Sequence, residues 1–303
     1  MNEIKIKEVS YGGWDNCVEI TNDIVDLIVT VDVGPRIIRL GFVGKENEMC
    51  EVGATLGRKG GSEWSIYGGH RLWHGPEDEY RTYEPDNSPV FWEKIPNGIK
   101  TLQDIEQRTG IRKEMEITLS QEGSRVHILH RLTNEGAGPM EVSVWSISAM
   151  STSGMEVVPQ TRRDTGLLPN RNMVLWPYTR LNDPRISLGD RYIILRQDPS
   201  EIRPLKFGTS NEQGWGAYFN HGHLFVKYYE HKEGAAYPDF GASYESYTND
   251  FMLEMETLSP LTMLEPGLSM EHSETWELFD DVQMPGNEDE IEEILRDRLH
   301  IQK

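Results

Sequence analysis

The sequence predicts a mainly β protein, either a sandwich or a barrel, with one helix at the C-terminus. Short runs of β-branched and apolar residues recur along the chain, and turn-forming pairs such as Asn97-Gly98 separate them. Helical segments do not alternate with these runs, so antiparallel pairing is favoured over βαβ units. Because no internal repeat, low-complexity run or clear linker interrupts the chain, we expect a single domain over residues 1–303.

The expected strands follow one another along the chain as far as residue 279. Ile24–Thr30 (IVDLIVT) is rich in β-branched residues, and Arg36–Val43 starts directly after the turn-forming pair Gly34-Pro35. Alternation of apolar and polar residues is typical of half-buried strands. It marks, with differing clarity, the later segments Glu114–Leu119, Arg125–Leu132, Met140–Ser148, Tyr192–Leu195, Leu224–Tyr229, Phe251–Thr257 and Met270–Phe279.

One helix is expected, in the acidic C-terminal tail 286–303. The segment Asn287–Ile301 has acidic residues early and Arg298 and His300 late, as the helix dipole prefers. Its apolar side chains form one stripe, which consists of Ile291, Ile294, Leu295 and Leu299. We expect this helix to dock on the sheet, with a dimerisation helix as the alternative. The sequence does not indicate the oligomeric state.

Composition and charge exclude several classes of protein. The chain has 50 acidic and 30 basic residues, a formal net charge of −20 that repels phosphate backbones and anionic lipid, so we expect neither a nucleic-acid nor a membrane partner. Two cysteines, Cys17 and Cys50, make no disulfide framework or zinc ribbon. The first residues contain no apolar signal segment, and no stretch approaches a membrane span. A cytoplasmic location is therefore expected.

The densest cluster of polar and aromatic residues is Trp64–Tyr83, which contains Gly68-Gly69, His70, Arg71, Trp73 and His74. Glycine pairs allow close approach of a backbone or a ligand. His70 and His74 share a face in a strand or a helix, but in a strand they lie about 13 Å apart, too far for one metal ion. A helix could join both to zinc with Glu77, but the glycines and Pro76 oppose a helix. We therefore expect histidines that flank a ligand, with no metal and no cofactor.

A second cluster, Tyr237–Thr257, ends in the expected strand Phe251–Thr257. Glu254 and Glu256 lie on one face of that strand, where repulsion would raise the pKa of each carboxyl towards the range useful to a general base. Aromatic, acidic and amide side chains that suit a sugar lead into the strand, namely Tyr244, Glu245, Tyr247 and Asn249. The alternative is a solvent-exposed strand face, which alternating glutamates commonly form.

The remaining histidines carry weaker signals. His127 and His130 would point to opposite faces of a strand, so we expect both to be structural. His221 and His223 flank a glycine and could bind a metal, but no carboxylate is placed beside them. Sequence motifs of serine hydrolases, P-loop proteins, dinucleotide-binding folds and zinc proteases are absent.

Four segments together resemble the galactose-mutarotase-like superfamily, which includes the aldose 1-epimerases, and they are most similar to a bacterial branch of it. These segments are TVDVGPRIIRLGFVG (30–44), YGGHRLWHGPE (67–77), HRLTNEGAGPMEVSVWSIS (130–148) and LEMETLSPLTMLEPGLSMEHSETWELF (253–279). The resemblance implies an antiparallel β-supersandwich that binds a small sugar across its concave face. It places Glu256 at the position of the catalytic base and gives Arg71 and His70 or His74 sugar-binding roles.

One departure from the pattern leaves three hypotheses. The superfamily's mutarotases carry an acid histidine after a strand like MEVSVWS, where this chain reads Val142–Ser148 without histidine. The first hypothesis is an aldose 1-epimerase-like isomerase with Glu256 as base and His70 or His74 as acid. The second is a non-catalytic carbohydrate-binding or sensing protein, and the third is a polysaccharide or oligosaccharide lyase-like enzyme. We expect one pocket lined by His70, Arg71, Trp73 and Glu256, with substrate contacts from Glu254, Tyr244, Glu245 and Asn249.

Overall fold

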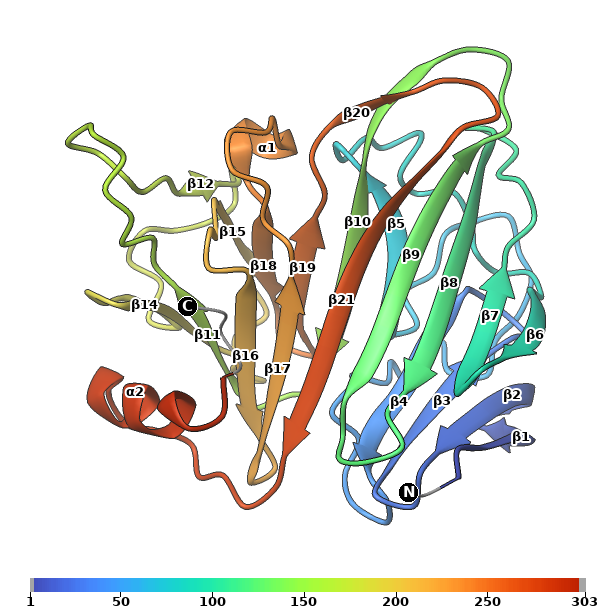
Figure 1. Ribbon diagram of the computed structural model, residues 1–303, viewed down its shortest axis with the longest axis horizontal. Helices are drawn as coiled ribbons and strands as arrows, with labels where there is room; N and C mark the ends of the chain where they lie inside the picture. Colours follow the sequence, from blue (N-terminus) through green and yellow to red (C-terminus); the bar gives the residue numbers. More distant parts are fainter. Residues whose placement is uncertain (1–2, 300–303) are drawn as a thin grey trace.

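The computed structural model describes residues 3–299 and contains two antiparallel β-sheets packed face to face. In Figure 1 the sheet that contains β21, β9, β8 and β7 lies in front of the sheet that contains β3, β4, β5 and β10. Strands make up 45% of the structure and helices 4%, so the predicted mainly β class is confirmed.

The first sheet has eleven strands, and every pair of neighbours in it is antiparallel. Ten strands form a continuous path, and β20 (Thr262–Leu264) pairs with β10 beside it. The path runs in the order β1 (Lys5–Tyr11), β2 (Trp14–Thr21), β3 (Val25–Thr30), β4 (Arg36–Phe42), β5 (Gly69–Gly75), β10 (Met140–Met150), β19 (Leu253–Leu258), β18 (Tyr244–Thr248), β15 (Leu205–Thr209) and β12 (Val174–Leu175).

The second sheet has ten strands, also antiparallel throughout. Its order is β13 (Ile186–Leu188), β14 (Tyr192–Arg196), β11 (Met155–Pro159), β16 (Trp215–Asn220), β17 (His223–Tyr229), β21 (Ser269–Phe279), β9 (Val126–Asn134), β8 (Ile111–Leu119), β7 (Gly98–Leu102) and β6 (Phe91–Ile95).

The main hydrophobic core lies between the two sheets. Val29 and Ile37 of the first sheet belong to the same buried cluster as Ile117 and Ile128 of the second. Each contributes an apolar side chain from one face of its strand, which is the arrangement that period-two patterns produce when two sheets pack together. Apolar side chains on the opposite faces of the two sheets belong to separate clusters.

The predicted C-terminal helix is present as α2 (Glu288–Arg296), which is shorter than Asn287–Ile301. The side chain of Asn287 caps its first turn by accepting hydrogen bonds from two backbone N–H groups. Ile291 and Leu295 pack against strands of the second sheet, which confirms the docked helix. The end of the predicted segment, His300 and Ile301, lies outside the described residues.

The other helix, α1 (Pro238–Gly241), is a single turn between β17 and β18. Neither helix among residues 3–299 has the length and apolar character needed to cross a membrane.

The predicted strands overlap β3, β4, β8, β9, β10, β14, β17, β19 and β21. Shorter strands such as β15 (LKFGT) had not been predicted. Such brief segments show too few alternations for a period to be recognised. One of these short strands, β15, carries Lys206 of the site described below.

Gly68 and Gly69 allow the chain to pass very close to neighbouring backbone at the start of β5. Both have positive φ angles, of 88° and 66°. A Cβ atom on Gly68 would lie 2.1 Å from the carbonyl oxygen of Cys50, and one on Gly69 would lie 2.3 Å from that of Ile37. The glycine pair therefore serves close packing of backbone on backbone, which seats β5 beside β4.

We predict that Gly69→Ala destabilises the fold more than Gly123→Ala. Both glycines have positive φ, but a Cβ on Gly123 would meet nothing within 4 Å. Gly123→Ala should cost only the left-handed penalty of about 1–2 kcal/mol, whereas Gly69→Ala adds an overpacking cost of about 1–3 kcal/mol. Urea unfolding measures both values. Equal losses of unfolding free energy in the two variants would show that the close backbone approach at Gly69 does not add to the cost of the substitution.

Candidate functional site

A cavity of about 400 Å³ opens on the face of the first sheet that points away from the second. Its floor comes from β5, β10, β19, β18 and β15, and loops add aromatic walls. The lining residues are Trp64, Ile66, Arg71, Trp73, Glu77, Tyr83, Trp145, Ile147, Trp176, Tyr178, Pro204, Lys206, Tyr247, Asn249, Phe251, Met252, Glu254 and Glu256.

Strand register brings the floor residues together. Trp73 of β5 lies opposite Trp145 of β10, and Ile147 of β10 lies opposite Glu256 of β19. Residues two apart on a strand share a face, so Arg71 joins Trp73 on the cavity side. The expected common face of Glu254 and Glu256 is present for the same reason.

Glu256 lies at the floor of the cavity and is 1% exposed. Its Oε2 accepts hydrogen bonds from Nε1 of Trp145 at 2.9 Å and from Nζ of Lys206 at 3.0 Å. Its Oε1 has no hydrogen-bond partner among the described residues. Burial raises the pKa of Glu256, and the charge of Lys206 opposes that shift. This leaves one buried carboxylate oxygen free to accept a hydrogen bond from a ligand.

Lys206 lies between two buried carboxylates. Its Nζ is 2.8 Å from Oε2 of Glu245 and 3.0 Å from Oε2 of Glu256, and it also lies 4.6 Å from the ring centres of both Trp145 and Trp176. Burial alone would lower the pKa of Lys206, but the charge of Glu245, followed by that of Glu256, raises it well above its usual value. Lys206 therefore holds its proton, and with it a positive charge, in the cavity wall.

The opposite wall is built around Arg71, which pairs with Glu254 at 2.6 Å. The guanidinium carbon of Arg71 lies 4.4 Å from the ring centre of Trp73, a cation–π contact. Trp73 in turn packs against Trp64 and Tyr83, with ring centres 5.4 and 5.1 Å apart. These flat rings offer apolar faces of the kind that bind the C–H face of a sugar.

His70 and His74 do not line the cavity, and the expectation that they share a pocket with Glu256 is wrong. Both side chains point into the space between the sheets, where they are at most 1% exposed. His70 hydrogen-bonds to His130 of β9, and Nε2 of His74 lies 3.6 Å from Glu106. Because β5 is a strand, the residues that alternate with Arg71 and Trp73 must face the other way.

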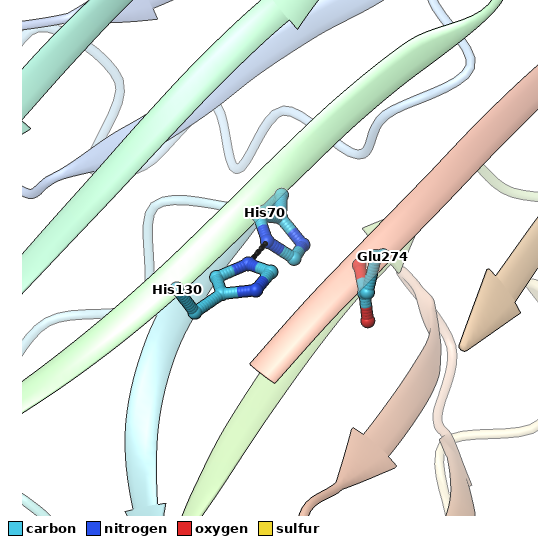
Figure 2. A group of neighbouring side chains, drawn as sticks. All are labelled: His70, His130 and Glu274. Carbon is cyan, nitrogen blue, oxygen red and sulfur yellow. Dashed lines mark hydrogen bonds between the residues drawn. The ribbon is translucent and has the colours of Figure 1, made fainter. Parts of the chain in front are cut away.

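His70 and His130 hydrogen-bond to each other between the sheets, and Figure 2 shows this bond beside Glu274. Nδ1 of His130 lies 3.0 Å from the carbonyl oxygen of His272, so it must carry a hydrogen. Burial lowers the pKa of His130 to about 4, which leaves Nε2 of this neutral ring to accept from His70, 2.7 Å away. Nδ1 of His70 then accepts from the hydroxyl of Ser148 at 2.8 Å.

These hydrogen bonds account for a cluster that could otherwise suggest a metal site. Single ligand atoms of His70, His130 and Glu274 lie within 4.8 Å of one another. Two nitrogens bound to one tetrahedral zinc ion lie about 3.3 Å apart, given Zn–N bonds of about 2.0–2.1 Å. The 2.7 Å separation of the two Nε2 atoms instead fits a hydrogen bond.

Glu274 ties the second sheet to the strands that carry the cavity. Its Oε1 accepts from Ser146 at 2.5 Å and Thr257 at 2.6 Å, and Nζ of Lys227 lies 3.1 Å away. Burial would raise the pKa of Glu274, but Lys227 lowers it below its usual range. Ser146 and Thr257 adjoin Trp145 and Glu256 in sequence, so this ion pair lies directly behind the cavity floor.

The other predicted contact residues divide between the two faces. Asn249 and Glu254 line the cavity. Tyr244 does not, because its side chain points between the sheets and its hydroxyl donates to Glu156 at 2.8 Å, so its predicted contact role is wrong. Glu245 faces the cavity side but is fully buried behind Lys206 and is not part of the lining.

Sequence reasoning missed Lys206, Trp145 and Trp176. Trp145 lies in the predicted strand Met140–Ser148, where alternation puts it on one face with Ser143 and Ile147 but does not show that this face lines a cavity. Lys206 and Trp176 come from strand β15 and from the residue after β12, which are too short to show a period. A search for buried cations between aromatic residues requires the tertiary contacts themselves.

No protein-family model matches the chain, and no curated protein matches it in sequence. Solved structures do resemble it. A galactose mutarotase-like protein from Lactobacillus casei ATCC 334 is 12% identical, with a TM-score of 0.56, and the match covers 87% of this chain and 100% of that one. One from Clostridium acetobutylicum is 11% identical, with a TM-score of 0.53, covering 92% and 99%.

A TPR-domain containing protein from Parabacteroides distasonis ATCC 8503 is 13% identical, with a TM-score of 0.59 over 90% of this chain. The chain spans 49% of the length of that protein. At these identities the likeness concerns the fold. The chain has the β-sandwich fold of galactose mutarotase-like proteins, as the sequence resemblance implied.

We predict that the buried histidines make the fold less stable as the pH is lowered. Burial lowers the pKa of His130 to about 4 and that of His272 to about 3. A histidine in the unfolded chain has a pKa of about 6.5. Below that pH the unfolded chain therefore binds protons at these histidines that the folded chain does not bind. The free energy of unfolding, measured with urea, should therefore fall from about pH 6.5 to about pH 4.

In His130→Asn this fall should be smaller than in the wild type, because one proton-binding group is lost from the unfolded chain. His127→Asn removes an exposed histidine from the same strand and should keep the wild-type fall. An unchanged pH dependence in His130→Asn would contradict the prediction.

Proposed function

We propose that the chain binds an aldose in the cavity of the first sheet and interconverts its anomers, as an aldose 1-epimerase does. The proposal is supported by the galactose mutarotase-like fold and by a cavity of about 400 Å³, a size typical of small-molecule sites. Aromatic walls and a few buried polar groups are the combination that such a ligand needs.

The observation that carries the proposal is the free Oε1 of Glu256. A buried acceptor without a partner is uncommon, because leaving it unsatisfied costs about 1–3 kcal/mol. A sugar hydroxyl in the cavity would donate to this oxygen. The raised pKa of Glu256 strengthens its affinity for a proton, which suits a base acting near neutral pH.

The proton donor in this proposal is Lys206, in place of a histidine. Glu256 takes the proton of the anomeric hydroxyl and becomes neutral, which removes one of the two carboxylate charges that raise the pKa of Lys206. The ammonium of Lys206, 3.0 Å from Oε2, then gives a proton to the ring oxygen. The ring opens, the C1–C2 bond rotates, and the ring closes on the other face of C1. Both protons then return, so the two side chains end in their starting states.

The non-catalytic carbohydrate-binding hypothesis is favoured by a different observation. No histidine lines the cavity among residues 3–299, and His70 and His74 lie between the sheets. The same absence of histidine from the lining weakens a lyase mechanism that pairs tyrosine with histidine. Binding without turnover is therefore the alternative that the following experiment tests.

We predict that Glu256→Gln keeps sugar binding but lowers anomer exchange by about 10²–10⁴-fold, because the amide preserves shape without a base. NMR exchange measures turnover on a panel of aldoses, and titration calorimetry measures binding. Glu141→Gln, an exposed site on the same sheet, is the control and should behave as the wild type. Full activity in Glu256→Gln would reject Glu256 as base.

Two further outcomes separate the hypotheses. Aldoses that bind to the wild type without any exchange would establish the carbohydrate-binding alternative. A panel in which no aldose binds would reject the proposed sugar site.

We also predict that Lys206→Met lowers kcat, because the proton donor is lost, and shifts the acidic limb of the remaining kcat/KM profile to higher pH. Glu256 must be ionised to act as base, and the charge of Lys206 lowers its pKa. Without that charge Glu256 faces Glu245 across the strand pair, so its pKa rises and activity is lost at a higher pH. An acidic limb that stays in place would show that Lys206 does not control Glu256.

A further inference from the structure

Carboxylates outnumber cations around the cavity. Glu77, Glu254 and Glu256 line it, and Glu245 lies directly behind Lys206. The cations among the lining residues are Arg71 and Lys206. If Glu245 and Glu256 share one proton, three negative charges still face two positive ones.

Both cations already have carboxylate partners. Arg71 pairs with Glu254 at 2.6 Å, and Lys206 contacts Glu245 and Glu256 at 2.8 and 3.0 Å. An acidic ligand would have to displace one of these buried pairs, and that would leave a carboxylate buried without its partner. Neither cation is therefore available to neutralise a phosphate or carboxylate on a ligand.

Glu77 adds an uncompensated negative charge at the opening. It is exposed, and it takes part in no ion pair among residues 3–299. Its Oε1 accepts a hydrogen bond from the hydroxyl of Tyr83 at 2.6 Å, which holds the carboxylate beside the aromatic wall. Its charge is close enough to Lys206 to raise the pKa of that residue.

We infer that the ligand of this cavity is an aldose without an acidic group, either uncharged or carrying an amine, and that Glu77 helps to exclude sugar phosphates and uronates. This inference rests on the proposed sugar site and names its substrate class. The physical basis is repulsion between like charges in a confined site, where two unit charges interact far more strongly than in bulk water.

The test is the affinity of matched sugars, measured by titration calorimetry. The probes are glucose, glucosamine, glucose 6-phosphate and glucuronate, together with the corresponding galactose series. At low ionic strength the acidic sugars should bind at least about tenfold more weakly than their neutral parents, and the amino sugars at least as tightly. Between about 10 mM and 1 M salt the Debye length falls from about 30 to 3 Å, so the difference should shrink.

Glu77→Gln should reduce the ratio of the affinity for a neutral sugar to that for its acidic counterpart by at least about threefold at low salt, because one negative charge is removed. Glu122→Gln changes a glutamate in the turn before β9, outside the cavity lining, and should leave this ratio unchanged. An acidic sugar that binds as tightly as its neutral parent would overturn the inference and leave the sugar site standing. A complete lack of binding by every probe would overturn both.

Discussion

The two-residue period of three adjacent strands is the constraint on which the site depends. Strands β5, β10 and β19 each present one set of side chains to the cavity and the alternate set to the space between the sheets. Arg71 therefore faces the cavity while His70 faces the second sheet. A shift of one residue in any of these strands would exchange the two sets and destroy both the cavity and the packing behind it.

The side chains of these strands that face the space between the sheets include many polar groups, and their burial depends on hydrogen bonding. Ser146 and Thr257 hydrogen-bond to Glu274 of the second sheet, where Glu274 pairs with Lys227, and Ser148 hydrogen-bonds to His70 within the first sheet. A buried network of this kind is stable only when every member is satisfied. It also holds in register the strands that carry the cavity floor, which links the sandwich interior to the site.

The side chains that face the cavity have an arrangement of charges that the fold alone does not determine. The fold is shared with galactose mutarotase-like proteins at low sequence identity, and fold alone does not determine chemistry. In this chain a lysine lies between two buried glutamates, and no histidine lines the cavity among residues 3–299. Paired charges at the floor and an unpaired carboxylate at the opening together define the electrostatic character of the site.

The sequence by itself determined the β class, the start of the last helix at Asn287 and the common face of Glu254 and Glu256. Strand period and helix capping are set by residues a few positions apart, so a local pattern records them. Only the tertiary structure decided which face of β5 turned towards the cavity and that Lys206 would reach Glu256, 50 residues later. Pairing between such distant strands depends on the packing of the whole sandwich, which no local pattern contains.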